Sequence, residues 1–229
     1  MDPITEIVAI DGPAGAGKST VARRVADALG YAFLDTGAMY RAATWWALRQ
    51  GVNLEDPGAL AAATREMPLE LRDADNGLQV FVGDHDITKA IRTPEVTREI
   101  YRLDQVPQVR EHLVALQRQY GARRPTVAEG RDMGTVVFPA AKCKVFLDAS
   151  LDERARRRLA ELQARGIAVD FESLRAEIHE RDEKTRSRAV APLRRAADAI
   201  LVDTTHMTID QAVETIAALA HAALNAKNN

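Results

Sequence analysis

An apolar run followed at once by a glycine-rich loop constrains the fold of this 229-residue chain more than any other feature. Ile7 to Ile10 is the continuous apolar run expected of a parallel strand that is buried on both faces. The loop from Gly12 to Ser19 fits the pattern G-x-x-x-x-G-K-[ST] in full. A helical pattern from Lys18 to Leu29 follows, and Gly30 can end it in the left-handed conformation. Strand, loop and helix together predict an α/β fold that binds a nucleoside triphosphate.

The residue types in this loop are suited to hold phosphate oxygens and a divalent cation. Glycines let backbone N–H groups approach the phosphates closely, and the positive end of the following helix faces them. Lys18 can reach the β- and γ-phosphates, and the Ser19 hydroxyl can bind Mg²⁺. The alternative is a glycine-rich turn that only begins a helix. We expect an ATP site made of Gly12, Pro13, Ala14, Gly15, Ala16, Gly17, Lys18, Ser19 and Thr20.

Strand-like and helical segments alternate along most of the chain, which predicts a parallel sheet covered by helices on both faces. After the first strand, further strands are expected at residues 32–34, 126–128, 144–147 and 199–202. Further helices are expected at residues 39–49, 94–102, 106–120, 151–165, 171–184 and 208–224. The buried face of the last helix is predicted to consist of Ile209, Val213, Ile216, Ala217 and Ala220.

Two short strand-like segments, at residues 69–71 and 78–82, interrupt this alternation. Between them stand the turn formers Asp73, Asp75, Asn76 and Gly77, which indicate a β-hairpin. We therefore predict an inserted subdomain at residues 60–105 with a small antiparallel sheet. The core domain would consist of residues 1–59 and 106–229, and residues 225–229 are expected to fray.

The composition argues against several classes of protein. A formal net charge of −2 gives no reason to expect a nucleic acid or an anionic membrane as partner. Cys143 is the only cysteine, so no disulfide framework exists and a reducing compartment is expected. The chain lacks a signal-peptide pattern and any run of about 18 apolar residues. We expect a soluble, cytoplasmic protein.

Two polar clusters follow predicted strands, at the edge where ligands of open α/β sheets bind. One cluster runs from Asp35 to Arg41, and the other from Glu129 to Asp132. Arginine clamps phosphate oxygens with two parallel hydrogen bonds, so these clusters could anchor a second phosphate and read a polar base. Asp35 and Asp132 have helix capping as their alternative role. Glu129 could hold the water shell of Mg²⁺ or form a purely structural ion pair.

The chain resembles bacterial cytidylate kinases, the long-insert type within the nucleoside-monophosphate kinases. The resemblance runs through nearly the whole chain, in the segments AIDGPAGAGKST, FLDTGAMYR, IRTPEVT, PQVRE, VAEGRDMGTVVFP, KVFLDAS, ERDEKTRSRAVAPL and ADAILVDT. GRDMGTVVFP and RAVAPL are more specific to these enzymes than the phosphate loop. A guanine-reading N-K-x-D sequence, which a GTP-driven switch would need, is absent.

The resemblance implies transfer of the ATP γ-phosphoryl group to CMP or dCMP by a monomer, with Mg²⁺ held by Ser19 and Glu129. It implies that the catalytic residues are Lys18, Arg131, Arg181 and Arg188. It implies CMP binding by Thr36, Arg41, Arg110, Arg131, Asp132, Arg181 and Arg188. Arg110 and Asp132 would recognise cytosine. Residues 60–105 would be the nucleoside-monophosphate-binding subdomain.

The resemblance also implies a mobile lid at about residues 152–190, from which Arg157 and Arg158 would contact ATP. A solvated helix face is the alternative for both arginines, and it is the expectation for Arg154. The sequence therefore predicts a solvated position for Arg154 and contact with ATP for Arg157 and Arg158, although the three stand close together on one helix.

Three positions depart from the family's pattern. Thr36 stands where many members have Ser, and it keeps the hydroxyl. Tyr101 stands where a base-contacting Ser is common, and Thr185 where an Asp meets the sugar hydroxyls. We expect a weakened preference between ribose and deoxyribose, or a substitute role for Asp182. Two interpretations compete with this one. The first is a related kinase whose acceptor is UMP, AMP or a non-nucleotide alcohol, and the second is a nucleotide sensor without catalytic activity.

Overall fold

The computed structural model describes residues 6–74, 77–164 and 166–225. These residues divide into two compact units. We call residues 32–124 the hairpin unit, and residues 6–31 with 125–225 the phosphate-loop unit. The predicted boundaries of the insert, 60–105, stay a prediction.

The phosphate-loop unit is built on a parallel sheet whose strands lie in the order β6-β1-β7-β8. Their bounds are β1 (Ile7–Asp11), β6 (Thr126–Gly130), β7 (Cys143–Asp148) and β8 (Ile200–Asp203). All five residues of β1 are buried, because this strand has a neighbour on each side and its apolar side chains point to both covered faces. The predictions of a parallel sheet and of a first strand buried on both faces are confirmed.

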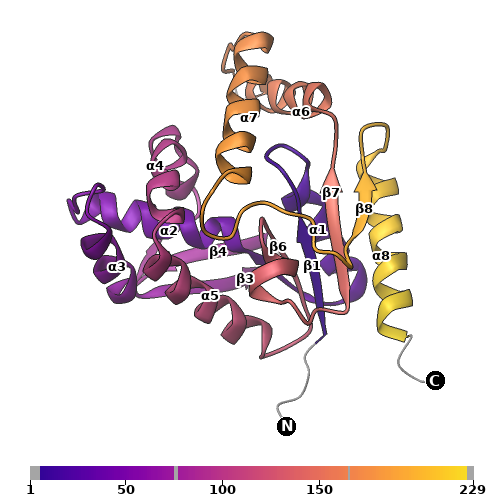
Figure 1. The fold of residues 1–229 in the computed structure, drawn as a ribbon, viewed down its shortest axis with the longest axis horizontal. Coiled ribbons are helices and arrows are strands. Elements are labelled where there is room, and N and C mark those ends of the chain that lie inside the picture. Colours follow the sequence, from indigo (N-terminus) through magenta and orange to yellow (C-terminus); the bar gives the residue numbers. More distant parts are fainter. Residues whose placement is uncertain (1–5, 75–76, 165, 226–229) are drawn as a thin grey trace. The chain divides into compact units, whose positions relative to one another are not determined.

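Helices on this unit complete the layers. They are α1 (Lys18–Leu29), α6 (Leu151–Ala164), α7 (Phe171–Arg186) and α8 (Ile209–Asn225), with a π-helical turn η2 (Met133–Val137). α1 packs against α8, and Figure 1 shows α8 running alongside β8. α6 and α7 form a helical hairpin beyond the carboxyl end of β7, with Ala155, Leu174 and Ile178 buried between them.

The hairpin unit combines helices with a small antiparallel sheet of order β3-β4-β5. Its elements are β2 (Ala32–Asp35), α2 (Thr36–Arg49), α3 (Pro57–Glu66), β3 (Leu69–Ala74), β4 (Gly77–Val82), β5 (His85–Asp86), η1 (Ala90–Arg92), α4 (Pro94–Asp104) and α5 (Pro107–Gly121). Pairing of Leu69 with Val82 and of Leu71 with Val80 confirms the predicted hairpin. Asp75 and Asn76 of its predicted turn lie outside the described residues.

Most predicted elements are confirmed, and the differences have local causes. α2 begins at Thr36 rather than at residue 39, because the Asp35 carboxylate accepts a hydrogen bond from the Ala38 N–H and caps the helix there. Ile209 is 49% exposed, so its prediction on the buried face of α8 is wrong. Ala212, one turn further along, is buried instead. In the part of the chain that the structure describes, none of the helices has the length and apolar character needed to cross a bilayer.

Candidate active site

The phosphate loop connects β1 to α1, and close packing fixes its shape. A Cβ on Gly12 would lie 2.0 Å from the carbonyl oxygen of Leu147, so only glycine fits there without a shift. Gly17 has a φ of 83° and precedes the first residue of α1, where the left-handed conformation suits glycine. Thr20 lies in the first turn of that helix. The loop therefore leads directly into a helix N-terminus, which favours anions.

Two cations, the buried Lys18 and the half-buried Arg131, bond to the carbonyl groups of this loop. The Lys18 Nζ donates to the Pro13 oxygen at 2.8 Å, and the Arg131 Nη1 donates to the Gly12 oxygen at 2.6 Å. Burial, and then the charge of Arg131, lower the pKa of Lys18 to about 7. Burial also lowers the pKa of Arg131 to about 10, so its guanidinium stays charged at neutral pH. The loop thus carries positive charge that is poorly solvated and available to an anion.

Arg181 and Arg188 bring further positive charge to the same place. Arg181 lies on α7 and Arg188 follows that helix, where it bonds to the carbonyl oxygen of Ala191. The charges of both arginines lower the pKa of Arg131, and that of Arg181 also lowers the pKa of Lys18. The four residues predicted to be catalytic therefore share one neighbourhood in the phosphate-loop unit.

Ser19 and Glu129 lie in direct contact. The Ser19 Oγ donates to the Glu129 Oε1 at 2.5 Å, and Glu129 is buried at the end of β6. Mg²⁺ prefers oxygen ligands and is commonly held by one or two carboxylates together with the phosphates of a substrate. A hydroxyl and a carboxylate beside a phosphate loop fit that requirement.

Asp11 fixes the turn that carries Arg131 and Asp132. Its two carboxylate oxygens accept hydrogen bonds from the backbone N–H groups of Met133 and Gly134, at 2.7 and 2.8 Å. Burial raises the pKa of Asp11 to about 6, against the lowering effect of these two bonds. Within the described residues, the Asp132 side chain makes no cap hydrogen bond to η2, so the capping alternative for Asp132 is wrong.

Arg154 does not lie on a solvated helix face, and that prediction is wrong. Its side chain is 5% exposed and pairs with Asp182, 3% exposed, at 2.5 Å. Arg154 also donates to the carbonyl oxygens of Ala149 and Ala14, at 3.0 and 2.9 Å. The second Asp182 oxygen accepts from the Ala14 N–H at 3.1 Å. Both Asp182 oxygens accept hydrogen bonds inside the protein, which disfavours a substitute role for Asp182 at the sugar hydroxyls.

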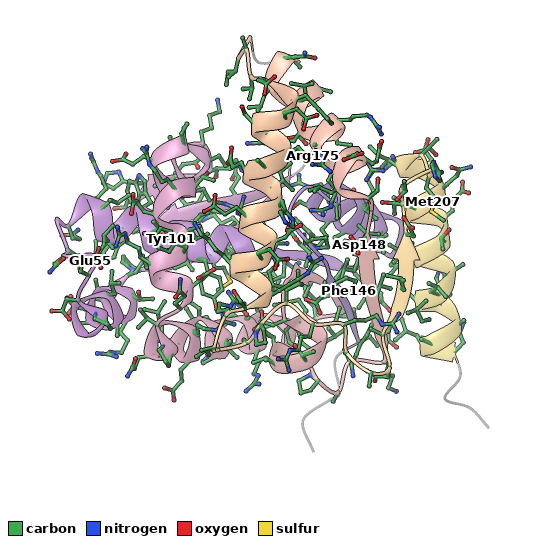
Figure 2. The ribbon with its side chains drawn as sticks, turned by 45° about the horizontal axis from the view of Figure 1, so that its top comes forward. Glu55, Tyr101, Phe146, Asp148, Arg175 and Met207 are labelled. Atoms are coloured by element: carbon green, nitrogen blue, oxygen red, sulfur yellow. The ribbon has the colours of Figure 1, made fainter. Side chains whose placement is uncertain are left out.

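The two other arginines of α6 differ from each other. Arg157 donates to the carbonyl oxygen of Thr204 at 2.6 Å and to its hydroxyl at 3.1 Å. Thr204 follows β8 and in turn bonds to Asp148, which Figure 2 labels at the end of β7. A further Arg157 contact reaches the Ala16 oxygen at 3.5 Å, so this residue borders the phosphate loop. Arg158 pairs with Glu161 on its own helix, at the surface, and its contact with ATP stays a prediction.

In the hairpin unit, Asp35 organises the start of α2. Besides capping the helix, its carboxylate pairs with Arg41 at 3.0 Å and with Arg92 at 3.5 Å. The capping alternative for Asp35 is confirmed, and the ion pairs show that capping is only part of its role. Thr36, the first residue of the helix, is buried. Arg41 is therefore held beside the carboxyl end of β2, with Thr36 next to it.

Arg110 is buried on α5, where it donates to the carbonyl oxygen of Asp104 at 3.3 Å and lies 5.4 Å from the centre of the Tyr40 ring. Tyr101, on α4 in Figure 2, is 39% exposed. Of the residues predicted to bind CMP, Thr36, Arg41 and Arg110 belong to the hairpin unit, and the other four to the phosphate-loop unit.

A sequence profile of the family described as "Cytidylate kinase" matches residues 8–222. The chain belongs to this family. It is 50% identical over 209 residues to the "Cytidylate kinase" of Shouchella clausii, covering 91% of this chain and 93% of that protein. It is 49% identical over 215 residues, 92% of this chain, to the "Bifunctional pantoate ligase/cytidylate kinase" of Synechococcus elongatus, but spans only 41% of that protein's length.

Solved structures support the fold. A gluconokinase from Sinorhizobium meliloti 1021 superposes with a TM-score of 0.51 at 17% identity, over 97% of this chain and 95% of that one. An uncharacterized protein from Eubacterium ventriosum gives a TM-score of 0.52 at 11% identity, over 95% and 99% of the two chains. At such identities the likeness shows the fold alone. The predicted α/β fold of P-loop kinases is confirmed for this cytidylate kinase family member.

Sequence reasoning missed three residues that shape the family's phosphate loop in this chain, namely Asp11, Arg154 and Asp182. A signal existed for Asp11, because a carboxylate at the end of a fully apolar strand must find buried donors. No local signal existed for the other two, because they lie 28 positions apart on two helices in which charged residues predominate.

Proposed function

We propose that this member of the cytidylate kinase family transfers the γ-phosphoryl group of ATP to CMP or dCMP, giving ADP and CDP or dCDP. The observation that carries the proposal is the gathering of Lys18, Arg131, Arg181 and Arg188 around one phosphate loop. A protein that only senses nucleotides has little use for so many cations, whereas a phosphoryl transfer gains from each of them.

In this reaction the four residues would align the two nucleotides and compensate negative charge. In the transition state, negative charge spreads over the equatorial oxygens of the transferring phosphoryl group. Lys18 and the three arginines offset that charge once the site is assembled, so little further reorganisation accompanies the reaction. The acceptor oxygen belongs to a phosphate that is already an anion at neutral pH. No dedicated general base is needed, and none of the roles requires a covalent nucleophile.

Ser19 and Glu129 would hold Mg²⁺ on the donor side. The ion supplies positive charge to the β- and γ-phosphate oxygens when it is bound there. Burial of Glu129 supports this role, since a carboxylate that is removed from water gains from a nearby cation. Arg157 and Arg158 would contact ATP from the lid at about residues 152–190. Lid closure would exclude water that otherwise hydrolyses ATP.

On the acceptor side, we assign Thr36 and Arg41 to the CMP phosphate and nucleotide, and Arg110 and Asp132 to cytosine. Burial of Arg110 and its fixed orientation against Tyr40 support a role in reading a planar base, because a base-reading group must be held in place before binding. Residues 60–105 would contribute the remainder of the monophosphate site. Tyr101 and Thr185 leave the order of preference among CMP, dCMP and UMP to experiment.

A coupled assay of ADP release tests the proposal directly. The protein is given ATP, Mg²⁺ and, in turn, CMP, dCMP, UMP and AMP. We expect rapid ADP release with CMP and dCMP, and slower release with AMP. The proposal fails if CMP does not stimulate ADP formation above the rate with ATP alone.

A further inference from the structure

Two charged side chains from different helices hold the same residue of the phosphate loop. Asp182 on α7 accepts from the Ala14 N–H at 3.1 Å, and Arg154 on α6 donates to the Ala14 carbonyl oxygen at 2.9 Å. The two side chains pair with each other at 2.5 Å. Ala14 thus has both of its backbone polar groups bound by one ion pair, and the orientations of the two peptide bonds that flank it are fixed.

The position of this pair is unusual for a purely stabilising contact. Replacing a buried ion pair with apolar groups is often neutral or favourable for stability, because desolvating two charges is costly. A carboxylate beside a loop that must receive anions would also repel them. The guanidinium of Arg154 offsets that charge, and the backbone of Arg154 packs on Gly15, where an added Cβ would lie 3.4 Å from the Arg154 carbonyl oxygen.

Asp182 connects the loop to one of the residues that we assign to catalysis. It immediately follows Arg181 on α7, and the charge of Arg181 acts on both Lys18 and Arg131. Bonding of Asp182 to Ala14 therefore fixes the distance between this part of α7 and the loop. A shift of α7 would move Arg181 away from the other cations, and misplacement by about 1 Å can slow a reaction about a hundredfold.

We propose that the Arg154–Asp182 pair is a positioning device, which fixes the phosphate loop at Ala14 and holds Arg181 at the correct distance from it. The inference rests on the proposed function, because it assigns Arg181 to phosphoryl transfer. Neither Arg154 nor Asp182 contacts a substrate in this account. Both act through the residues that they hold.

A second ion pair between the same helices provides a matched control. Asp152 on α6 pairs with Arg175 on α7 at 2.6 Å, but these side chains are 51% and 42% exposed, and within the described residues neither hydrogen-bonds to the loop. Figure 2 shows Arg175 on α7. Removing this pair tests whether any link between α6 and α7 suffices.

The test compares the buried pair with the exposed one. The variants are Arg154→Met, Asp182→Asn, the double variant Arg154→Met with Asp182→Leu, and the control Asp152→Asn with Arg175→Met. For each, kcat, the KM for CMP and the thermal midpoint are measured. In the three variants of the Arg154–Asp182 pair, we expect kcat to fall about tenfold or more and the KM for CMP to change less than about threefold. The control should stay within about twofold of the unmodified protein.

The double variant decides between positioning and stability. It leaves no unpaired buried charge, so it is expected to fold even where a single variant does not. A merely structural pair would give the double variant a restored kcat together with a normal thermal midpoint, and that result would overturn the inference. Unchanged kcat in a folded single variant would overturn it as well.

A readout independent of the acceptor separates this inference from the proposed function. If the unmodified protein releases no ADP with CMP, the proposed function fails. Amide hydrogen exchange at Ala14, with Mg·ATP affinity, then tests the positioning. We expect faster exchange and weaker ATP binding in the double variant than in the control. Equal exchange rates at Ala14 in the double variant and in the control would contradict the positioning role of the pair.

Discussion

The Lys18 ammonium donates a hydrogen bond to the carbonyl oxygen of Pro13 at 2.8 Å, within the loop that both residues form. The nitrogen is buried, and its pKa is lowered from the ordinary 10.5 to about 7. Desolvation is the largest cause and the charge of Arg131 the next. Burial therefore disfavours the charged form of Lys18, which the chemistry proposed for it requires.

Binding of ATP at pH 8 is predicted to take up a proton at Lys18. A polyanion beside the ammonium favours its charged form, so the pKa of Lys18 rises on binding. ATP affinity should then weaken as the pH rises above 7, since protonating Lys18 becomes more costly as the proton concentration falls. Calorimetry in two buffers of different ionisation enthalpy measures the uptake. The same proton stoichiometry at pH 6 and pH 8, after correction for the nucleotide's own ionisation, would count against this account.

Asp35→Ala is predicted to destabilise the protein more than the loss of a helix cap alone. The variant loses the cap of α2, worth about 1 kcal/mol, and leaves the partly buried Arg41 without this carboxylate. Together these effects should lower the free energy of unfolding by about 2 to 3 kcal/mol. Urea unfolding followed by circular dichroism measures the difference.

Asp56→Ala is the matched control for that variant. Asp56 caps α3 through the N–H groups of Gly58 and Ala59, but it is exposed and belongs to the same unit. Its replacement should lower the free energy of unfolding by about 1 kcal/mol. Equal losses in the two variants would show that the Asp35–Arg41 pair adds nothing.

Thr185→Asp is predicted to raise the preference for CMP over dCMP. The Thr185 hydroxyl donates to the Arg181 carbonyl oxygen at 2.7 Å within its own helix. A carboxylate at this position would offer an acceptor to the ribose hydroxyls, and one such bond corresponds to about a fivefold to tenfold change. The ratio of kcat/KM for the two substrates is the measurement. An unchanged ratio would remove Thr185 from the sugar site.

Glu129→Gln separates the two roles considered for Glu129. If the carboxylate serves Mg²⁺, the Mg²⁺ concentration for half-maximal activity should rise about tenfold, since the charge is lost while the shape is kept. If Glu129 is only the structural partner of Ser19, stability falls and the Mg²⁺ dependence stays the same. Titration of Mg²⁺ at fixed ATP distinguishes these outcomes, and Ser19→Ala should shift the dependence in the same direction.

Local signals in the sequence predicted the elements that have local causes. α1 begins at Lys18 and ends at Leu29 as predicted, because Gly17 and Gly30 adopt left-handed conformations at its two ends. The segment of α3 was not predicted, although Asp56 and Pro57 form a helix start signal. Its alanine-rich sequence shows little periodic contrast between buried and exposed positions. Ile209 was misplaced because it is the first residue of α8, ahead of the buried positions that begin at Ala212.

The environments of individual charges depend on contacts that a sequence does not reveal. Arg154, Arg157 and Arg158 stand within one polar stretch of α6, yet the first is buried in an ion pair, the second borders the loop and the third lies at the surface. Long-range partners such as Asp182 and Thr204 decide among these environments. The phosphate loop, in contrast, could be predicted because its glycines and its lysine are local requirements of phosphate binding.

Following the terminal phosphate of ATP tests the central claim most directly. The protein is incubated with γ-labelled ATP, Mg²⁺ and CMP, and the labelled products are separated, with Lys18→Ala as the control. We predict that the label moves to CDP, and that transfer falls about a hundredfold or more in Lys18→Ala while its unfolding midpoint changes little. Label found in inorganic phosphate rather than CDP, or undiminished transfer by Lys18→Ala, would contradict the account.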